Sequence, residues 1–337
     1  MKLSVVIPCR NEEKFIAECI DAIYANNLNE EIELSVIVVD GMSDDGTREI
    51  INQLALKYSN LYTVDNVAKL TPYAFNLGIK FKEADYYQIV GARQILSLNY
   101  LSTSIQKLQA NQVIWCVGGA VENVYVNEVG EIIAKAMSTT FGMGLGNFRT
   151  LEESSFSDTV GTPMYPKEVF ERIGYFDEDL VRNQDDDYNF RVLKAGGKIW
   201  FEHSISLKYY VRGDYYGLYR QFFQYGYWKV FVNRKHKQVT TVRQLVPPLF
   251  VAYILFFPLF ILVGSPIKDL AFLGIGIYLL LALFFSNKKA KNTSEFLGIL
   301  KTFPILHFSY GLGYILGIIH FLILGKNPTE NQKRLSR

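Results

Sequence analysis

The stretch Val5-Val6-Ile7-Pro8-Cys9-Arg10-Asn11-Glu12-Glu13 turns a short apolar run into a polar, acidic loop. An apolar, β-branched run of this length, here residues 3–7, is typical of a strand buried in a parallel sheet. The residues that follow, 12–26, place their apolar side chains on one face and predict a helix. A second buried strand is predicted at 34–39, and the loop Asp40-Gly41-Met42-Ser43-Asp44-Asp45-Gly46-Thr47 follows it.

The alternation continues with helices predicted at 45–58 and 72–81 and strands predicted at 60–64 and 86–90. Strands that alternate with helices predict a parallel sheet joined by right-handed crossovers. Ligands of such sheets bind beyond the carboxyl ends of the strands, where Asp40 leaves the second strand. A carboxylate there can accept hydrogen bonds from sugar hydroxyls or from a base N–H. The alternative for this loop is turn formation and helix capping by Ser43, Asp44 and Asp45.

The composition excludes several classes of protein. Apolar residues make up 49% of the 337 residues, which excludes a disordered chain. The net charge of +2 gives no electrostatic case for nucleic acid as a partner. The three cysteines are too few for a disulfide framework and lack the spacing of metal ligands.

Charges are spread evenly up to Arg243, and three long uncharged stretches follow. They predict a membrane domain at 244–325 with two to three spans, at about 245–264, 270–287 and 303–324, followed by a basic polar tail at 326–337. The alternative is three buried core helices, but soluble helices carry a polar face that these stretches lack.

The large N-terminal part carries no predicted signal peptide, so we expect it on the cytoplasmic side of the inner membrane. Basic residues before the first span and at 288–291 agree with the positive-inside rule. Three spans would place the tail outside, although the tail carries Lys326, Lys333, Arg334 and Arg337. Either the first span is re-entrant or the tail breaks the rule.

Five stretches together are similar to family 2 glycosyltransferases with the GT-A fold: 5–13, 38–47, Thr71-Pro72-Tyr73-Ala74-Phe75-Asn76-Leu77-Gly78-Ile79, Gly161-Thr162-Pro163-Met164-Tyr165 and Ile173-Gly174-Tyr175-Phe176-Asp177-Glu178. The chain most resembles the membrane-anchored branch that builds exopolysaccharide, such as succinoglycan glucosyltransferases. The resemblance covers residues 1–235, including a predicted interfacial helix at 209–235. It implies an α/β, Rossmann-like, mostly parallel sheet followed by transmembrane helices.

The resemblance also implies roles for individual residues. Pro8 and Glu12 would line the nucleotide pocket, Asp40 would bind the nucleotide, and Asn76 would lie on the helix that faces the donor. The segment 184–191 aligns with the family's Glu-Asp motif, whose aspartate is the general base, and that aspartate is Asp185.

The residues near Asp185 add acceptor-side candidates. Inverting transfer needs an acceptor hydroxyl that is deprotonated as it attacks, and clustered carboxylates raise one another's pKa toward the working range. Asp186 and Asp187 complete this cluster, and the alternative is an acidic helix start that favours the helix dipole. Trp228 lies in Gln224-Tyr225-Gly226-Tyr227-Trp228-Lys229, which resembles a feature of the branch near the membrane, where a lipid-linked acceptor would arrive.

One departure from the family pattern concerns the metal. The family carries an Asp-X-Asp motif after the fourth strand for Mg²⁺ or Mn²⁺, and this chain has Gly91, Ala92 and Arg93 instead. Arginine cannot bind a metal but binds phosphate bidentately, so we hypothesise that Arg93 replaces part of the metal's charge. The alternatives are a surface arginine, or a metal held by Asp185, Asp187 or His203. The divalent cofactor is therefore left open.

The aromatic-rich segment 209–228 contains Arg212 and Arg220, Lys229 follows it, and the pattern predicts a helix at the membrane interface. The alternative is a core helix with snorkelling cations. The segment 137–157 predicts a flexible acceptor loop or lid.

These features predict an inverting glycosyltransferase. It would move a sugar from a nucleotide-sugar donor, by family habit a UDP-sugar, to a lipid-linked saccharide or polyprenyl phosphate at the membrane. The lost metal motif, together with Gln184 in place of glutamate, leaves one alternative from another class. That alternative is an inactive, glycosyltransferase-like membrane scaffold of a polysaccharide-assembly complex.

Overall fold

The computed structural model describes residues 1–144, 151–240 and 242–328, and it divides into two compact units. The first unit comprises Met1–Glu122 and Leu151–Tyr210, and the second comprises Asn123–Thr150 and Val211–Arg337. Helix α9 therefore belongs to the unit of the apolar helices, whereas the sequence groups it with residues 1–235. Part of the predicted lid at 137–157 and most of the basic tail lie outside the described residues.

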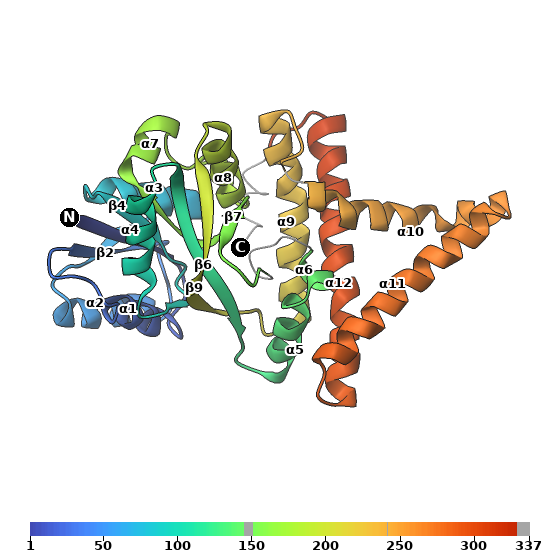
Figure 1. The fold of residues 1–337 in the computed structure, drawn as a ribbon, viewed down its shortest axis with the longest axis horizontal. Coiled ribbons are helices and arrows are strands. Elements are labelled where there is room, and N and C mark those ends of the chain that lie inside the picture. The colour runs from blue at the N-terminus through green and yellow to red at the C-terminus, as the bar shows by residue number, and fades with distance from the viewer. Residues whose placement is uncertain (145–150, 241, 329–337) are drawn as a thin grey trace. The chain divides into compact units, whose positions relative to one another are not determined.

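The first unit is built on one mixed sheet (Figure 1). Its strands among the described residues are β1 Lys2–Cys9, β2 Glu33–Asp40, β3 Leu61–Asp65, β4 Tyr86–Ile89, β5 Gln94–Leu96, β6 Ile114–Val124, β7 Ser155–Ser157, β8 Gly161–Pro166 and β9 Lys198–Tyr210. The order is β3-β2-β1-β4-β8-β6-β9-β5, with β7 beside β9. The half that contains β1 to β4 is parallel, as predicted, and β8 adds an antiparallel half.

Helices cover both faces of this sheet. They are α1 Ile16–Tyr24, α2 Thr47–Lys57, α3 Thr71–Phe81, α4 Tyr100–Ala110, α7 Lys167–Ile173 and α8 Gln184–Lys194. Val5 and Ile7 of β1 belong to the core cluster that includes buried residues of α1, α2 and α4. Val6 faces the other way, and a Cβ on Gly78 of α3 would lie 2.3 Å from its side chain. Glycine therefore lets α3 approach the sheet closely.

Helix α1 begins at Ile16, although the apolar pattern predicts a start at residue 12. The carbonyl oxygen of Glu12 accepts hydrogen bonds from the backbone N–H groups of Phe15 and Ile16, so a turn precedes the helix. The extra loop residues carry the Glu12 side chain beside the end of β1.

The second unit is helical in the described residues. It contains α5 Glu128–Met137, α6 Thr140–Met143, α9 Tyr215–His236, the 3₁₀ turn η1 Val242–Leu245, α10 Val246–Val263, α11 Ile267–Lys289 and α12 Thr293–Gly317, which continues into the π-helical segment η2 Ile318–Ile323. Helices α9 and α12 run side by side (Figure 1). A Cβ on Gly313 would lie 2.0 Å from the carbonyl oxygen of Phe223, and a Cβ on Gly226 would lie 2.0 Å from that of Tyr310. Glycine at both positions permits this close packing.

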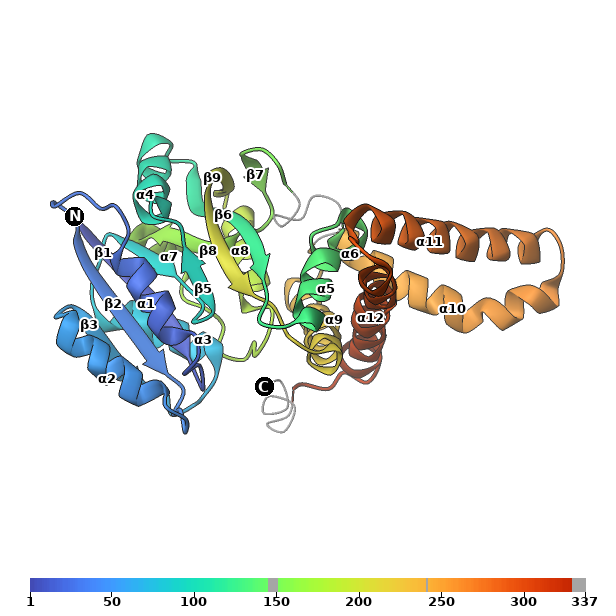
Figure 2. The ribbon, with the colours of Figure 1, turned by 90° about the horizontal axis from the view of Figure 1, so that it is seen from below.

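Three segments are long and apolar enough to cross a membrane: Val242–Val263, Ile267–Lys289 and Thr293–Ile323. They differ in burial, because 11% and 17% of the first two apolar windows are buried inside the structure but 39% of the third is. Figures 1 and 2 show α10 and α11 as a hairpin that extends away from the α9–α12 pair. The exposed apolar side chains of this hairpin suggest association with a membrane.

Candidate active site

The loops that follow β1 and β2 are tied together by side-chain hydrogen bonds. The Asn11 side chain donates to Asp44 Oδ1 over 2.7 Å and accepts from the Asp44 backbone N–H over 3.1 Å. The Glu12 backbone N–H donates to Thr47 Oγ1 over 2.8 Å. Pro8, the penultimate residue of β1, stands in register with Val39 of β2, so it lies beside the start of the second loop. The two loops therefore form one ordered edge at the carboxyl ends of adjacent parallel strands.

Asp40 ends β2 and is fully buried. Its carboxylate accepts a hydrogen bond from Arg48 Nε over 2.6 Å and one from the Ser43 backbone N–H over 3.0 Å. Arg48 also contacts the carboxylate of Asp65, the residue that pairs with Asp40 at the end of β3. The hydrogen bond to Asp40 raises the pKa of the Arg48 guanidinium.

Arg48 and Asp65 were not selected from the sequence. Asp65 could have been found from strand register, because the predicted third strand ends beside the second. Arg48 gave no comparable signal.

Arg93 and Glu12, both selected from the sequence, meet in the structure. Arg93 Nε donates to Glu12 Oε2 over 2.7 Å, and its guanidinium lies 4.9 Å from the centre of the Phe15 ring. The two residues follow β4 and β1, which are neighbours in the sheet. The pair therefore bridges the ends of two parallel strands, and the side chain of Arg93 is only about a quarter exposed.

The turn that carries Arg93 is held from both sides. Gln94 Oε1 accepts hydrogen bonds from the Gly91 N–H over 2.6 Å and from Thr162 Oγ1 over 2.8 Å. Thr162 itself has a φ of 51°, in the left-handed region that a β-branched residue rarely adopts. Such strained residues concentrate at functional sites. The Gly161–Tyr165 motif thus serves to fix the turn that carries Arg93.

Asn76 is buried, and its amide contacts the segment before α8. Its Nδ2 donates to the carbonyl oxygen of Phe176 and to Glu178 Oε1, both over 2.9 Å. Its Oδ1 accepts from the Phe176 N–H over 3.0 Å. Asn76 therefore links the 71–79 and 173–178 motifs.

The three carboxylates of α8 lie in its first turn but occupy different environments. Asp187 is fully buried and forms an ion pair with Arg191 over 3.0 Å. Asp186 is half-buried and Asp185 is exposed. Asn183 precedes them with a φ of 59°. The helix start thus presents Asp185 to solvent while Asp187 anchors the helix.

The residues present do not fit a divalent metal of the kind the family pattern implies. Mg²⁺ and Mn²⁺ prefer oxygen ligands, yet Gly91, Ala92 and Arg93 supply no carboxylate after β4. Within residues 1–144, 151–240 and 242–328, no group of three or more His, Cys, Asp or Glu residues could hold a metal. His203 lies exposed on β9. We therefore derive no step through a metal.

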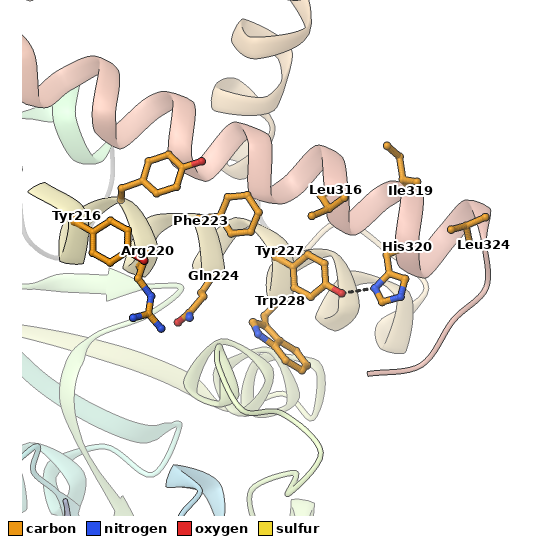
Figure 3. Close-up of a pocket in the computed structure, with 11 residues that line it drawn as sticks. Tyr216, Arg220, Phe223, Gln224, Tyr227, Trp228, Leu316, Ile319, His320 and Leu324 are labelled. Carbon is orange, nitrogen blue, oxygen red and sulfur yellow. Dashed lines mark hydrogen bonds between the residues drawn. The ribbon is translucent and has the colours of Figure 1, made fainter. Parts of the chain in front are cut away.

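Trp228 lies in the second unit, beside a cavity of about 720 Å³ between α9 and the end of α12 (Figure 3). The cavity is lined by Tyr216, Tyr219, Arg220, Phe223, Gln224, Tyr227, Trp228, Leu316, Ile319, His320 and Leu324. Trp228 is buried and its ring packs against Phe321. The Tyr227 hydroxyl forms a hydrogen bond with His320 Nδ1. Residues far apart in the sequence form this cavity, so the aromatic pattern alone did not predict it.

The parallel half-sheet with its tied loops, extended by antiparallel strands, defines a GT-A fold, and the ordered strand edge is where such folds bind ligands. The family model for glycosyl transferase family 2 matches residues 4–174, and the chain belongs to this family. Five site candidates (Pro8, Glu12, Asp40, Asn76 and Arg93) lie inside the matched region.

Known relatives agree with this assignment. The chain is 30% identical over 240 residues to the dolichyl N-acetyl-alpha-D-glucosaminyl phosphate 3-beta-D-2,3-diacetamido-2,3-dideoxy-beta-D-glucuronosyltransferase of Methanococcus voltae, covering 69% of this chain and 74% of the relative. It is 27% identical over 245 residues to the succinoglycan biosynthesis protein ExoA of Rhizobium meliloti, covering 72% and 73%. A mannosyltransferase from Pyrobaculum calidifontis, solved with GDP-Man and Mn²⁺, has a TM-score of 0.60 at 16% identity and covers 91% and 86% of the two chains. This last likeness supports the fold.

Proposed function

We propose that this glycosyltransferase moves a sugar, with inversion, from a UDP-sugar to a lipid-linked saccharide or polyprenyl phosphate at the cytoplasmic face of the membrane. The observation that carries the proposal is family membership combined with the ordered edge after β1, β2 and β4. The names of two relatives support the acceptor class, because one acts on a dolichyl-phosphate-linked sugar and the other belongs to succinoglycan biosynthesis. The apolar hairpin supports a membrane location.

The donor would bind along the strand edge. Asp40 and Arg48 would shape the nucleoside side, since both groups lie at the end of β2. Arg93 would face the diphosphate, because a guanidinium offers a fixed fork of donors for phosphate oxygens. Glu12 holds that guanidinium in place. The positive charge would stabilise the nucleoside diphosphate as it leaves.

Asp185 would act as the general base. It would remove the proton of an acceptor hydroxyl while the hydroxyl oxygen attacks the anomeric carbon. The bond from that carbon to the diphosphate then breaks with its electron pair, and the nucleoside diphosphate leaves. Asp187 and Arg191 would position the first turn of α8, and an exposed Asp185 is accessible to an acceptor.

The charges on α9 support a proposal for which helices cross the membrane. Arg220, Lys229, Arg234 and Lys235 are distributed along this helix, which packs beside α12. Each charge costs about 2.5–3.5 kcal/mol at the centre of a spanning helix, so α9 is unsuited to crossing the bilayer together with α12. We therefore infer that α10 and α11 cross as a hairpin while α9 and α12 lie at the interface. This arrangement leaves the basic tail on the side of the catalytic unit and resolves the conflict in the positive-inside rule.

The test is thermal stabilisation of the full-length protein in detergent by UDP, GDP, CDP and dTDP, each with Mn²⁺ and with EDTA. A ligand at 100 times its Kd adds about 2.7 kcal/mol of stability. We expect a shift with UDP that EDTA does not remove, followed by transfer from a UDP-sugar to a lipid extract. A folded protein that responds to no nucleotide would overturn the proposal in favour of an inactive scaffold.

A further inference from the structure

We propose that the cavity between α9 and α12 binds the phosphate and the first isoprene units of a polyprenyl-linked saccharide acceptor, with the phosphate on Arg220. This inference rests on the proposed function and names the part of the second unit that would hold the lipid. All residues that line the cavity belong to that unit.

The cavity has one apolar wall and one polar side. Leu316, Ile319 and Leu324 come from the end of α12 and the segment that follows it, and they form the apolar wall (Figure 3). Leu324 is 55% exposed. Apolar side chains in this position gain about 25 cal/mol for each Å² that a hydrocarbon removes from water. The wall thus suits the chain of a lipid.

The polar side carries positive charge. Figure 3 shows Arg220 and Gln224 of α9 pointing away from α12. The guanidinium of Arg220 lies 5.8 Å from the centre of the Tyr216 ring, which limits its orientations. The lining residues within the described chain include an arginine and a histidine but no carboxylate. An anion is therefore the favoured polar part of the ligand, and arginine is well suited to phosphate.

The location selects a lipid over a soluble phosphate. The wall residues end the α12 segment, which is apolar enough to enter a membrane. Tyr216, Tyr219 and Trp228 add amphipathic rings of the kind that concentrate at the headgroup level. A volume of about 720 Å³ lies within the usual range of organic ligand sites, roughly 300–1,000 Å³, and far exceeds the needs of a phosphate ion. A chain with a phosphate at one end matches both sides of the cavity.

The experiment measures binding of radiolabelled geranylgeranyl phosphate to the full-length protein in detergent. Unlabelled geranylgeraniol, inorganic phosphate and phosphatidic acid serve as competitors. Two variants change the cavity: Arg220→Gln removes the charge, and Ile319→Trp fills the apolar side. Arg243→Gln is the matched control, because Arg243 lies in η1 and does not line the cavity. UDP binding, a property of the first unit, is measured on every variant.

We expect Arg220→Gln to weaken geranylgeranyl phosphate binding at least tenfold, as the loss of a charged hydrogen bond implies. Ile319→Trp should weaken it comparably, whereas Arg243→Gln and all UDP affinities should stay within about twofold of wild type. Geranylgeraniol and inorganic phosphate should compete at least tenfold less well than the labelled compound.

Three results would overturn the inference. The first is no saturable binding by a protein that still binds UDP. The second is that Arg220→Gln and Ile319→Trp bind geranylgeranyl phosphate as tightly as the wild type does. The third is that phosphatidic acid displaces the label as effectively as unlabelled geranylgeranyl phosphate. None of these results would contradict the proposed transferase activity. That proposal is contradicted by a different result, namely a protein that binds no UDP and transfers no sugar.

Discussion

At the scale of single residues, the candidate site depends on charges held in fixed positions. Arg93 is constrained by Glu12, by the Phe15 ring and by the turn that Gln94 closes. If a diphosphate binds at this edge as proposed, a cation held in this way needs little reorganisation when the diphosphate arrives. Glu12 partly neutralises it, which keeps the pair stable when no donor is bound.

The first prediction concerns Arg93→Ala. Loss of a bidentate, charge-assisted contact costs about 1.5–3 kcal/mol, so we expect at least a tenfold weaker UDP affinity and a lower turnover. Calorimetric titration with UDP measures the affinity, with and without EDTA. Arg172→Ala is the control, because Arg172 stacks on Trp115 in the same unit and lies outside the site. Wild-type binding that EDTA abolishes, together with normal binding by Arg93→Ala, would contradict the role of Arg93.

The second prediction separates the carboxylates of α8. General-base catalysis contributes about 10²–10⁴-fold in rate, so Asp185→Asn should lose at least about 100-fold in turnover and keep its UDP affinity. Asp186→Asn should stay within about tenfold of wild type if Asp185 alone supplies the general base. Asp187→Asn should lower the melting temperature, because it breaks a buried ion pair.

Turnover of the same purified preparations with a saccharide acceptor gives the comparison. Full activity of Asp185→Asn would exclude it as the base. It would also favour polyprenyl phosphate as acceptor, which needs no deprotonation.

The limits of sequence reasoning are clearest at this scale. Glu12 and Arg93 could be predicted as site residues because each follows a strand. Adjacent parallel strands end at the same edge of the sheet, so residues that follow them lie close together. Whether a side chain faces a ligand or the protein interior depends on tertiary contacts. Asn76 and Asp187 are both buried, and they form a hydrogen bond and an ion pair, respectively, with other residues of the protein. The same contacts reveal Arg48, whose partner Asp65 lies in a different strand.

At the scale of elements, strongly patterned segments could be predicted and short ones could not. The strand at 86–90 and the helix at 72–81 are within one residue of β4 and α3 at each end. Strands β5 and β7 have only three residues each, too few for a periodic signal, and both pair with β9 at long range. The antiparallel half of the sheet therefore depends on pairings that no local pattern specifies.

The third prediction tests the close packing of α9 and α12. Gly313→Ala places a Cβ 2.0 Å from a backbone oxygen, so the helices must separate and the protein should lose about 1–3 kcal/mol of stability. Gly276→Ala is the matched control, because a Cβ there meets nothing within 4 Å. It should be neutral or slightly stabilising, since alanine is the better helix former. Thermal unfolding in one detergent compares the two, and equal melting temperatures would contradict the packing.

A fourth prediction concerns Glu202 on β9. Its carboxylate accepts hydrogen bonds from Ser204 and Trp200 and pairs with Lys107 over 3.0 Å. Burial alone would raise the pKa of Glu202, but these hydrogen bonds outweigh it and lower the pKa from 4.5 to about 2. A depressed pKa contributes stability above pH 4.5 that is lost as the pH falls toward 2, at most about 3 kcal/mol.

Glu202→Gln should therefore unfold at lower temperature than wild type at pH 7, and the difference should shrink between pH 4.5 and pH 2. Melting temperatures across this range measure the effect, with Glu168→Gln on α7 as the exposed control. A constant difference at every pH would mean that Glu202 stabilises the fold by packing alone.

At the scale of the whole molecule, composition predicted a membrane part, but it could not distinguish a spanning helix from one at the interface. All three apolar segments satisfy the length and hydropathy of a span. The difference lies in their partners, because α12 is covered by a charged helix while α10 and α11 expose apolar side chains along the hairpin. Only tertiary structure shows this difference in exposure, on which the proposed topology rests.

The last prediction follows from this difference and concerns topology. Single cysteines are introduced at Ser265 in the hairpin turn, at Asn292 before α12 and at Ser336 in the tail, and intact spheroplasts are treated with a membrane-impermeant maleimide. The native Cys9, Cys19 and Cys116 are buried and should label weakly. We expect Ser265→Cys to label in intact cells, and Asn292→Cys and Ser336→Cys to label only after permeabilisation, because two spans return the chain to its starting side.

If Ser336→Cys also labels in intact cells, α12 crosses the bilayer and carries the charges of α9 with it. If Ser265→Cys is protected, the hairpin is re-entrant, and the exposed apolar side chains of α10 and α11 are covered within one leaflet.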